Sequence, residues 1–362
     1  MSAESHATST WFPSIICILM NSTRQAALTP PSRIAWIDVC KGIGIALVVL
    51  GHVAPDTGLL HNSIYIFHMP LFFFLSGYLR SAKPNFGNYF EKKSINLLLP
   101  YLAFLLLLFP VAVIGFLHQP GLISRVIHLA YNSAWGGTKL SGVHSTFWFI
   151  SCLFMTQQIM NFLIVKTRLP IVILISVLCL LVSYFVAFNY PSLDLPLDIN
   201  VVLAAIPIFC LGYLSKNLPL NSPWLAVFAF SGAVCAFILV WRGVGVEVDM
   251  KAGNYGIPFL SFVLGYCCVL SLIYLSRIVA LIPFLSGILA SAGTYSMGIM
   301  FIHSTPRILC SYLHFSLVMN FAVSLTTSYL FSYIISRFRV TQALLLGWAT
   351  DLNELRSIIC QS

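Results

Sequence analysis

Long apolar stretches recur along the whole sequence, and each is long enough to cross a lipid bilayer. A spanning helix needs about 17–25 predominantly apolar residues. Because lipid cannot hydrogen-bond the backbone, segments of this length cross as helices. The stretches cover residues 34–54, 64–80, 95–117, 146–165, 170–188, 199–215, 224–241, 257–276, 285–303 and 315–336. We therefore predict an all-α fold, a polytopic integral membrane bundle of about ten transmembrane helices.

The composition supports a membrane protein and argues against a soluble domain. Hydrophobic residues make up 59% of the chain and charged residues 8%, whereas a soluble domain carries about 25% charged residues. The ten cysteines lie mainly in apolar runs and form no CxxC pair. We interpret them as small buried apolar residues, and we predict neither a disulfide framework nor a metal site.

The basic residues predict the orientation in the membrane. Of the nineteen Lys and Arg residues, thirteen fall in the termini and the loops on their side, five in the opposite loops, and Lys41 within the first stretch. Basic residues accumulate on the cytoplasmic side, so both termini should be cytoplasmic, in a multi-pass protein of the inner (plasma) membrane. The net charge of +9 then reflects orientation. We expect membrane lipids as partners and no nucleic acid.

The chain divides into three parts on this interpretation. Residues 1–32 contain only a short apolar run without the basic start of a signal peptide, and we expect a poorly ordered N-terminal extension. Residues 33–340 form the transmembrane domain, and residues 341–362 a cytoplasmic C-terminal tail. On the opposite side, the long segment 118–145 and the segment 189–198, which holds Asp194 and Asp198, favour function because long loops in compact proteins often carry it.

The first stretch carries three ionisable residues, Asp38, Lys41 and His52, which are costly to place in lipid. On a helix, with Asp38 at zero, Lys41 lies at about −60° and His52 at about −40°, so all three share one face. Lys41 and His52 are roughly 16 Å apart along the axis. Asp38 is therefore too far from His52 to bond it, and we predict that Asp38 pairs with Lys41 one turn away.

Two further polar features flank the second stretch. His68 precedes Pro70, which should begin or kink a helix, and antiparallel packing brings His68 to the depth of His52. His68 could equally satisfy a backbone carbonyl there. Beyond this stretch, a cytoplasmic run contains Arg80, Lys83, Lys92 and Lys93. This run could hold a polyanion such as a nucleotide phosphate, although anionic lipid headgroups would also suit it.

Five blocks of sequence carry a family resemblance. In order they are IDVCKGIGIALVVLGH (37–52), FHMPLFFFLSGYL (67–79), KKSINLLLPY (92–101), STFWFISCLF (145–154) and TYSMGIMFIH (294–303). The chain resembles the acyltransferase 3 family of integral membrane O-acyltransferases, and within it the fucose 4-O-acetylase-like sugar O-acetyltransferases. The resemblance implies about ten core helices and transfer of an acyl group, commonly acetyl from cytoplasmic acetyl-CoA, to a sugar hydroxyl at the membrane.

The resemblance also implies site residues. The family has a motif in its first helix, in which an Arg or Lys is followed after ten residues by a His. Lys41 and His52 match this motif, and Asp38 matches the acidic residue just upstream. A pair of basic residues three apart is met only in part, by Lys93 and Asn96. Because Asn96 cannot supply a cation, Lys92 could substitute. The late block ends in His303, which could also be a satisfied interfacial histidine.

These residues suggest a mechanism for acetyl transfer. His52 would act as the base, because imidazole titrates near neutral pH, with Asp38 and Lys41 completing the catalytic set. The phosphates of CoA would meet Lys41, Lys92, Lys93 and Asn96. The acceptor would approach from the far side through segment 118–145 and contact His68, Trp148 and His303, although Trp148 could instead be an interface anchor. Acetyl-CoA would be a substrate, and no tightly bound cofactor is expected.

The acceptor expected from the resemblance is a sugar or lipid-linked glycan of the cell surface, of the O-antigen, capsule or exopolysaccharide type. Composition alone leaves two alternatives open. A transporter or flippase of a small molecule or lipid-linked sugar would also place charged residues on interior helix faces. A catalytically silent scaffold would tolerate replacement of both Lys41 and His52.

Overall fold

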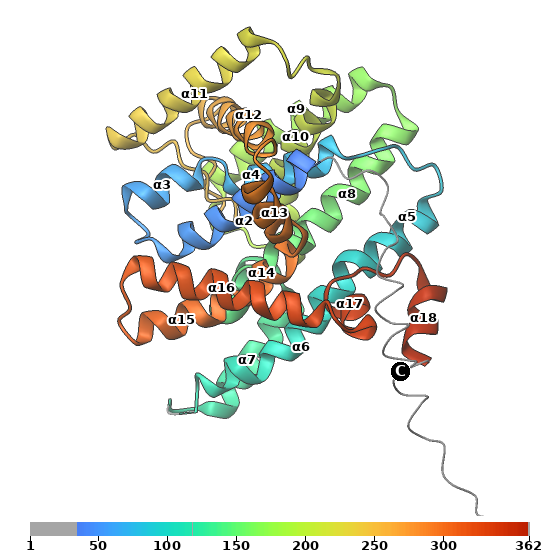
Figure 1. Ribbon diagram of the computed structural model, residues 1–362, viewed down its shortest axis with the longest axis vertical. Coiled ribbons are helices and arrows are strands. Elements are labelled where there is room, and N and C mark those ends of the chain that lie inside the picture. Colours follow the sequence, from blue (N-terminus) through green and yellow to red (C-terminus); the bar gives the residue numbers. More distant parts are fainter. Residues whose placement is uncertain (1–34, 118, 361–362) are drawn as a thin grey trace, which may run out of the picture. The chain divides into compact units, whose positions relative to one another are not determined.

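A computed structural model describes residues 35–117 and 119–360. The predicted extension 1–32 lies outside the described residues. The helices, labelled in Figure 1, are α2 (Ala35–Val53), α3 (Leu59–Tyr65), α4 (His68–Tyr78), α5 (Phe86–Lys93), the π-helical turn η1 (Ser94–Leu98), α6 (Leu99–Ile114), α7 (Leu122–Trp135), α8 (Trp148–Lys166), α9 (Leu169–Asn189), α10 (Ile199–Leu214), α11 (Pro223–Trp241), α12 (Leu260–Val279), α13 (Pro283–Thr294), α14 (Ser296–Ile302), α15 (Ser304–Tyr312), α16 (Leu317–Ile335), α17 (Arg339–Leu345) and α18 (Leu352–Cys360).

The predicted all-α, polytopic membrane fold is confirmed. In the described part of the chain, nine helical segments are long and apolar enough to cross a membrane. A tenth span results if α13 and the following α14–α15 are counted together, although this pair is bent by 61°. The cytoplasmic placement of the termini stays a prediction.

The helices differ in how much of their surface other helices cover. In one group of helices, 50–67% of the residues in the most apolar stretch are buried; this group is α2, α3–α4, α8, α10 and α12. In a second group the share is only 22–28%; this group is α6, α9, α11 and α16. The first group forms the interior, and α2 contacts α3, α4, α12, α13, α14 and α16 (Figure 1). The second group leaves large apolar side chains exposed, such as Leu106, Phe188 and Val234, as expected of helices that face lipid.

Glycines allow the interior helices to approach closely. Where α2 crosses α13, a Cβ on Gly42 would lie 1.9 Å from the carbonyl oxygen of Leu289, and one on Gly293 would lie 1.9 Å from that of Asp38. No side chain fits at either position. Small residues at a helix crossing bring two backbones into contact in this way, and the crossing fixes the position of the helix that carries His52.

The segment predicted as a long loop and the segment predicted as a C-terminal tail both contain helices. Segment 118–145, expected as a long loop, contains α7 and the short 3₁₀ turns Gly137–Lys139 and Gly142–His144. The tail after residue 340 forms α17 and α18, whose apolar side chains Ala343, Leu355 and Ile358 cluster with Ile95 of η1. Helices this short are marginal on their own, so their packing against the rest of the protein stabilises them.

Candidate active site

Three aromatic rings, those of Tyr65, His68 and His303, lie beside His52 near the end of α2. Its Nδ1 lies 3.2 Å from the hydroxyl of Tyr65. The ring of His303 stacks on that of His52 with centroids 5.3 Å apart, and the ring of His68 meets it edge-on at 6.2 Å. The break between α3 and α4 places Tyr65 and His68 on the two sides of one turn. The structure therefore brings together three of the histidines predicted from the sequence.

The hydrogen bonds of these histidines distinguish His52 from its neighbours. In three histidines, Nδ1 lies within 3.0–3.2 Å of a backbone carbonyl oxygen. These pairs are His61 with Gly51, His68 with Ile64, and His303 with Ile299. Because a carbonyl only accepts, each of these Nδ1 atoms carries the proton and each Nε2 holds the lone pair. The partner of His52 is a hydroxyl, which can donate or accept, so both tautomers of His52 remain available.

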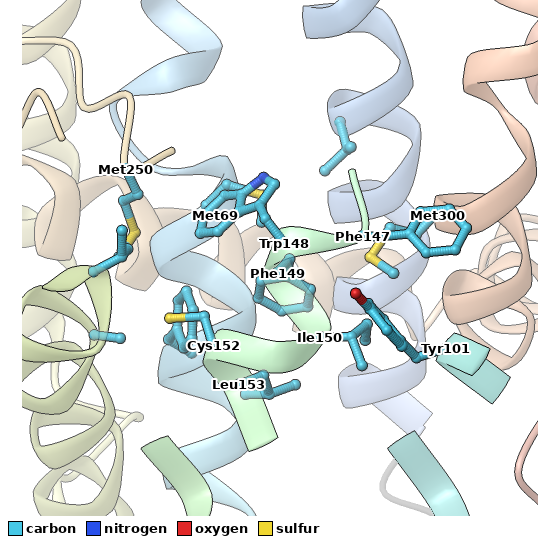
Figure 2. Packing of buried hydrophobic residues seen from close by; sticks show 14 of the residues in the cluster. Met69, Tyr101, Phe147, Trp148, Phe149, Ile150, Cys152, Leu153, Met250 and Met300 are labelled. Carbon is cyan, nitrogen blue, oxygen red and sulfur yellow. The ribbon is translucent and has the colours of Figure 1, made fainter. Parts of the chain in front are cut away.

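A cavity of about 190 Å³ opens beside His52. His52, Tyr65, His68, Met69, Ser145, Trp148, Asp249, Met250 and Lys251 line it. Figure 2 shows Trp148 and Met69 with Met250 next to them, so apolar groups form part of the wall around the imidazoles. We call this space the histidine cavity. It combines a titratable base with apolar walls, which is typical of small-molecule sites.

Lys251 fixes the loop that closes the histidine cavity. Its Nζ donates to the carbonyl oxygens of Leu140 at 2.6 Å and Ser145 at 3.0 Å. Burial lowers the pKa of Lys251, and the carboxylates of Asp198 and Asp249 oppose that shift. An ammonium has three N–H donors, so these two bonds leave one donor of Lys251, which lines the histidine cavity.

Asp38 and Lys41 lie in the N-terminal half of α2, whereas His52 lies at its C-terminal end. As predicted they form an ion pair, with Lys41 Nζ 3.4 Å from Asp38 Oδ1. Neither residue is among those lining the histidine cavity. Both side chains are partly exposed. The structure therefore separates this pair from His52, and the participation of Asp38 and Lys41 in the chemistry stays a prediction.

A second cavity, of about 600 Å³, lies among the basic residues between α4 and α6. Arg80, Lys83, Lys92 and Lys93 line it, and we call it the basic cavity. Arg80 is 7% exposed, and its Nε and Nη2 have no hydrogen-bond partner among the described residues. Its guanidinium lies over the ring of Tyr89, 4.3 Å from the centroid, and burial lowers its pKa. Unpaired buried donors are costly, so this site suits an anion.

Asn96 does not line the basic cavity. Its side-chain amide donates to the carbonyl oxygens of Gly347 and Ala349 in the C-terminal segment. The amide nitrogen is therefore engaged within the protein. The structure gives Asn96 a role in holding the segment after α17, and it does not bring Asn96 to Lys92 and Lys93 at the cavity.

The two cavities lie at different depths along the same helices. On α8, Trp148 lines the histidine cavity and Gln157 the basic cavity, which corresponds to roughly 14 Å along the axis. The two cavities have no lining residue in common. The intervening turns bury Phe149, Cys152 and Leu153 (Figure 2). A molecule that reaches both cavities therefore has to displace packed side chains.

Sequence reasoning missed several residues of the site. Arg307 is one of the five basic residues that the sequence places in the loops opposite the termini, but in the structure it lies in α15. Its Nη1 donates to the backbone oxygen of His52 at 3.3 Å. A signal for it exists, because Arg307 follows His303 by four residues and so shares its helix face. Tyr65, Asp249 and Lys251 gave no comparable signal.

Comparison with known proteins gives the family. The model of a family described as an acyltransferase domain, acyltransferase 3, matches residues 34–337. Two curated relatives are both named nodulation protein NolL. The one from Sinorhizobium fredii is 27% identical over 244 residues, covering 58% of this chain and 58% of the relative. The one from Mesorhizobium japonicum is 30% identical over 191 residues, covering 49% and 46%.

The aligned regions thus span about half the length of these relatives. No solved structure matches the chain. The family match extends over most of the chain and includes all the helices that form the histidine cavity and the basic cavity. The chain therefore belongs to the acyltransferase 3 family, as its sequence blocks predicted.

Proposed function

We propose that the protein is an inner-membrane O-acyltransferase that moves acetyl from cytoplasmic acetyl-CoA to a hydroxyl of a cell-surface sugar or glycan. The observation that carries the proposal is the pairing of two chemically different cavities along α8. The histidine cavity offers His52, which can adopt either tautomer. The basic cavity offers N–H donors of Arg80 that have no partner among the described residues.

The base in this reaction is His52. When its Nδ1–H donates to the hydroxyl oxygen of Tyr65, its Nε2 carries the lone pair needed to accept a proton. The acceptor oxygen attacks the thioester carbonyl carbon while Nε2 takes the hydroxyl proton. The carbon–sulfur bond then breaks, and the proton passes to the departing thiolate. The products are the O-acetyl sugar and free CoA.

The developing oxyanion needs donors aimed at it. The third N–H of Lys251 is available for this, because the other two are taken by the carbonyls of Leu140 and Ser145. Lys251 lines the histidine cavity together with His52. We assign it the stabilisation of the oxyanion.

The CoA phosphates bind in the basic cavity. Arg80 offers Nε and Nη2, and Lys92 and Lys93 add point charges for phosphoryl oxygens. The pantetheine arm extends from there along α8 toward His52. Because packed side chains separate the two cavities, donor binding requires them to move, which fits a reaction that excludes water until both substrates are present.

The test is mass spectrometry of cell-envelope glycans from four strains: intact, gene-deleted, and complemented with His52→Ala or with His128→Ala. His128 is an exposed histidine on α7 and serves as the matched control. We expect one acetyl increment per modified sugar in the intact and His128→Ala strains, and none in the other two. Membrane levels of each variant are checked by immunoblotting.

Wild-type acetylation in the His52→Ala strain would remove His52 from the chemistry. Unchanged glycans in all four strains, together with substrate flux through reconstituted vesicles, would favour the transporter instead. Replacement of both Lys41 and His52 without any phenotype would favour a silent scaffold.

A further inference from the structure

A third cavity, of about 440 Å³, adjoins the histidine cavity and takes no part in the mechanism above. It lies between the end of α9, the segment 190–200 that precedes and begins α10, and the loop 249–255. We call it the polar cavity. Asp249 and Lys251 line both the polar cavity and the histidine cavity. The two spaces therefore share a wall, and a molecule held in one lies next to the other.

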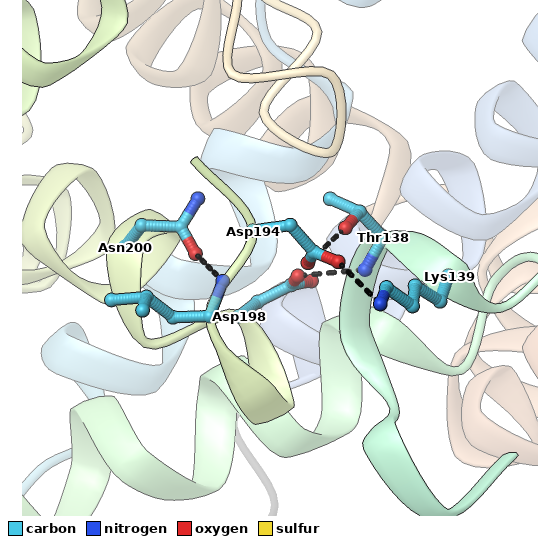
Figure 3. Close-up of polar contacts among 6 residues, drawn as sticks. Thr138, Lys139, Asp194, Asp198 and Asn200 are labelled. Atoms are coloured by element: carbon cyan, nitrogen blue, oxygen red, sulfur yellow. Dashed lines mark hydrogen bonds and ion pairs between the residues drawn. The ribbon is translucent and has the colours of Figure 1, made fainter. Parts of the chain in front are cut away.

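The floor of the polar cavity is held by a network of hydrogen bonds, shown in Figure 3. Asp194 accepts from the hydroxyl of Thr138 at 2.5 Å and pairs with Lys139 at 3.6 Å. Asp198, which is fully buried, accepts from the backbone N–H of Thr138 at 2.8 Å. The 137–139 turn and segment 194–200 are thus fixed to each other. Binding groups held this way are in place before a ligand arrives.

The lining of the polar cavity matches the chemistry of a sugar. Tyr190 and Tyr255 offer aromatic surfaces, and the side chains of Ser192 and Asn200 offer a hydroxyl and an amide. Asn200 Oδ1 accepts from the backbone N–H of Leu195 at 3.4 Å, so its NH₂ group remains as a donor. Mixed apolar surface with a few placed polar groups is typical of small-molecule sites.

The charges in this lining select among sugars. Asp194 and Asp249 contribute two carboxylates, while the one ammonium, that of Lys251, already donates to two backbone carbonyls. An anionic sugar would meet the carboxylate of Asp249 with no free cation beside it among the described residues, because Lys139 is already paired with Asp194, and this is unfavourable in a partly enclosed site. A neutral sugar meets acceptors and donors for its hydroxyls without that cost.

We propose that the polar cavity is the subsite that binds the acceptor, as a neutral sugar whose reacting hydroxyl passes between Asp249 and Lys251 toward His52. This inference rests on the acyl transfer proposed above. It narrows the approach through segment 118–145, of which Thr138 lines the polar cavity, to one between the loops that follow α9 and α11.

The first experiment measures binding without requiring catalysis. The full-length protein carrying Ser192→Cys is reconstituted in nanodiscs and labelled with a maleimide, and labelling is followed by peptide mapping. The probes are methyl glycosides of glucose, galactose, mannose, fucose, rhamnose and N-acetylglucosamine, with the methyl glycoside of glucuronic acid as the anionic counterpart. Ser124→Cys, an exposed serine on α7 outside the cavity, is the matched control.

We expect at least one neutral glycoside to slow labelling of Ser192→Cys severalfold while labelling of Ser124→Cys is unchanged. Absence of protection by every neutral glycoside would overturn the subsite. Equal protection by the glucuronide would overturn the preference for neutral sugars. Protection in a protein that transfers no acetyl group would uphold the subsite and reject the proposed function, so the two failures are distinguishable.

A second experiment uses kinetics. Ala252 is exposed and lines the polar cavity, so Ala252→Trp fills it. We expect KM for the acceptor to rise at least tenfold with KM for acetyl-CoA unchanged, and Ser124→Trp to leave both unchanged. An Ala252→Trp enzyme with wild-type KM for the acceptor would overturn the proposal.

Discussion

The hydroxyl of Tyr65 lies 3.2 Å from Nδ1 of His52, and in the neighbouring His61, His68 and His303 the same ring nitrogen faces a backbone carbonyl instead. This hydroxyl orients the imidazole and leaves both tautomers of His52 available, because it can donate or accept. Tyr65→Phe removes the hydroxyl and keeps the ring. Because a hydrogen bond contributes about 0.5–1.5 kcal/mol net, we expect kcat to fall roughly two- to twelvefold. Steady-state kinetics in nanodiscs measures the change.

The control for Tyr65→Phe is Tyr312→Phe, which alters an exposed tyrosine on α15. It should leave kcat at the wild-type value. A Tyr65→Phe enzyme with unchanged kcat would show that the hydroxyl does not support His52 during the reaction.

Arg80→Gln removes the buried cation whose Nε and Nη2 have no partner within the described structure. A hydrogen bond to a charged group contributes about 1.5–3 kcal/mol, so we expect KM for acetyl-CoA to rise tenfold or more. The acceptor KM should not change. Arg168→Gln, on an exposed arginine outside the basic cavity, is the matched control, and equal effects of the two substitutions would contradict a specific phosphate site.

Gly293→Ala places a methyl group against the carbonyl oxygen of Asp38. Overpacking of this kind costs about 1–3 kcal/mol, and we expect a lower Tm in detergent micelles. Gly287 lies on the same helix α13 with open space around its Cβ position, so Gly287→Ala should leave Tm unchanged or raise it slightly, because alanine favours a helix. Similar Tm values for both variants would mean that α2 and α13 do not cross as described.

Asn96→Asp removes the amide donor that bonds the carbonyls of Gly347 and Ala349. A carboxylate only accepts when ionised, so the segment after α17 should loosen. We expect faster cleavage by trypsin at Arg356, measured by limited proteolysis, with KM for acetyl-CoA at its wild-type value. A large rise in that KM with unchanged proteolysis would restore Asn96 to the donor site expected from the resemblance.

The transmembrane helices could be predicted because each is encoded by a continuous apolar stretch. The ion pair of Asp38 and Lys41 could be predicted for the same local reason, since one helical turn separates the two residues. The proximity of His52 and His68 followed from antiparallel packing of consecutive spans. These inferences need only helix geometry and short connections.

The rest of the site depends on contacts between distant parts of the chain. Lys251 reaches carbonyls more than a hundred residues earlier, and Arg307 reaches the carbonyl of His52. The loop after α11 alternates apolar residues at Val244, Val246 and Val248, which indicates an extended segment but does not record which distant part of the chain it contacts. The partners of Asn96 could not be predicted for the same reason, since they lie in the C-terminal segment.

Because Asp249 and Lys251 line both cavities, substitutions at these residues should differ in effect from substitutions at residues that line the polar cavity alone. Seven residues within segment 186–194 line the polar cavity but not the histidine cavity, whereas Asp249 and Lys251 line both. With the acceptor bound in the polar cavity as proposed, exchanging the first segment between relatives is expected to change the preferred sugar while the rate is retained. Substituting Asp249 or Lys251 is expected to change the sugar preference and the reaction rate together. Among relatives that modify different glycans, we therefore expect the sequence to vary in the segment after α9 and to vary little in the loop after α11.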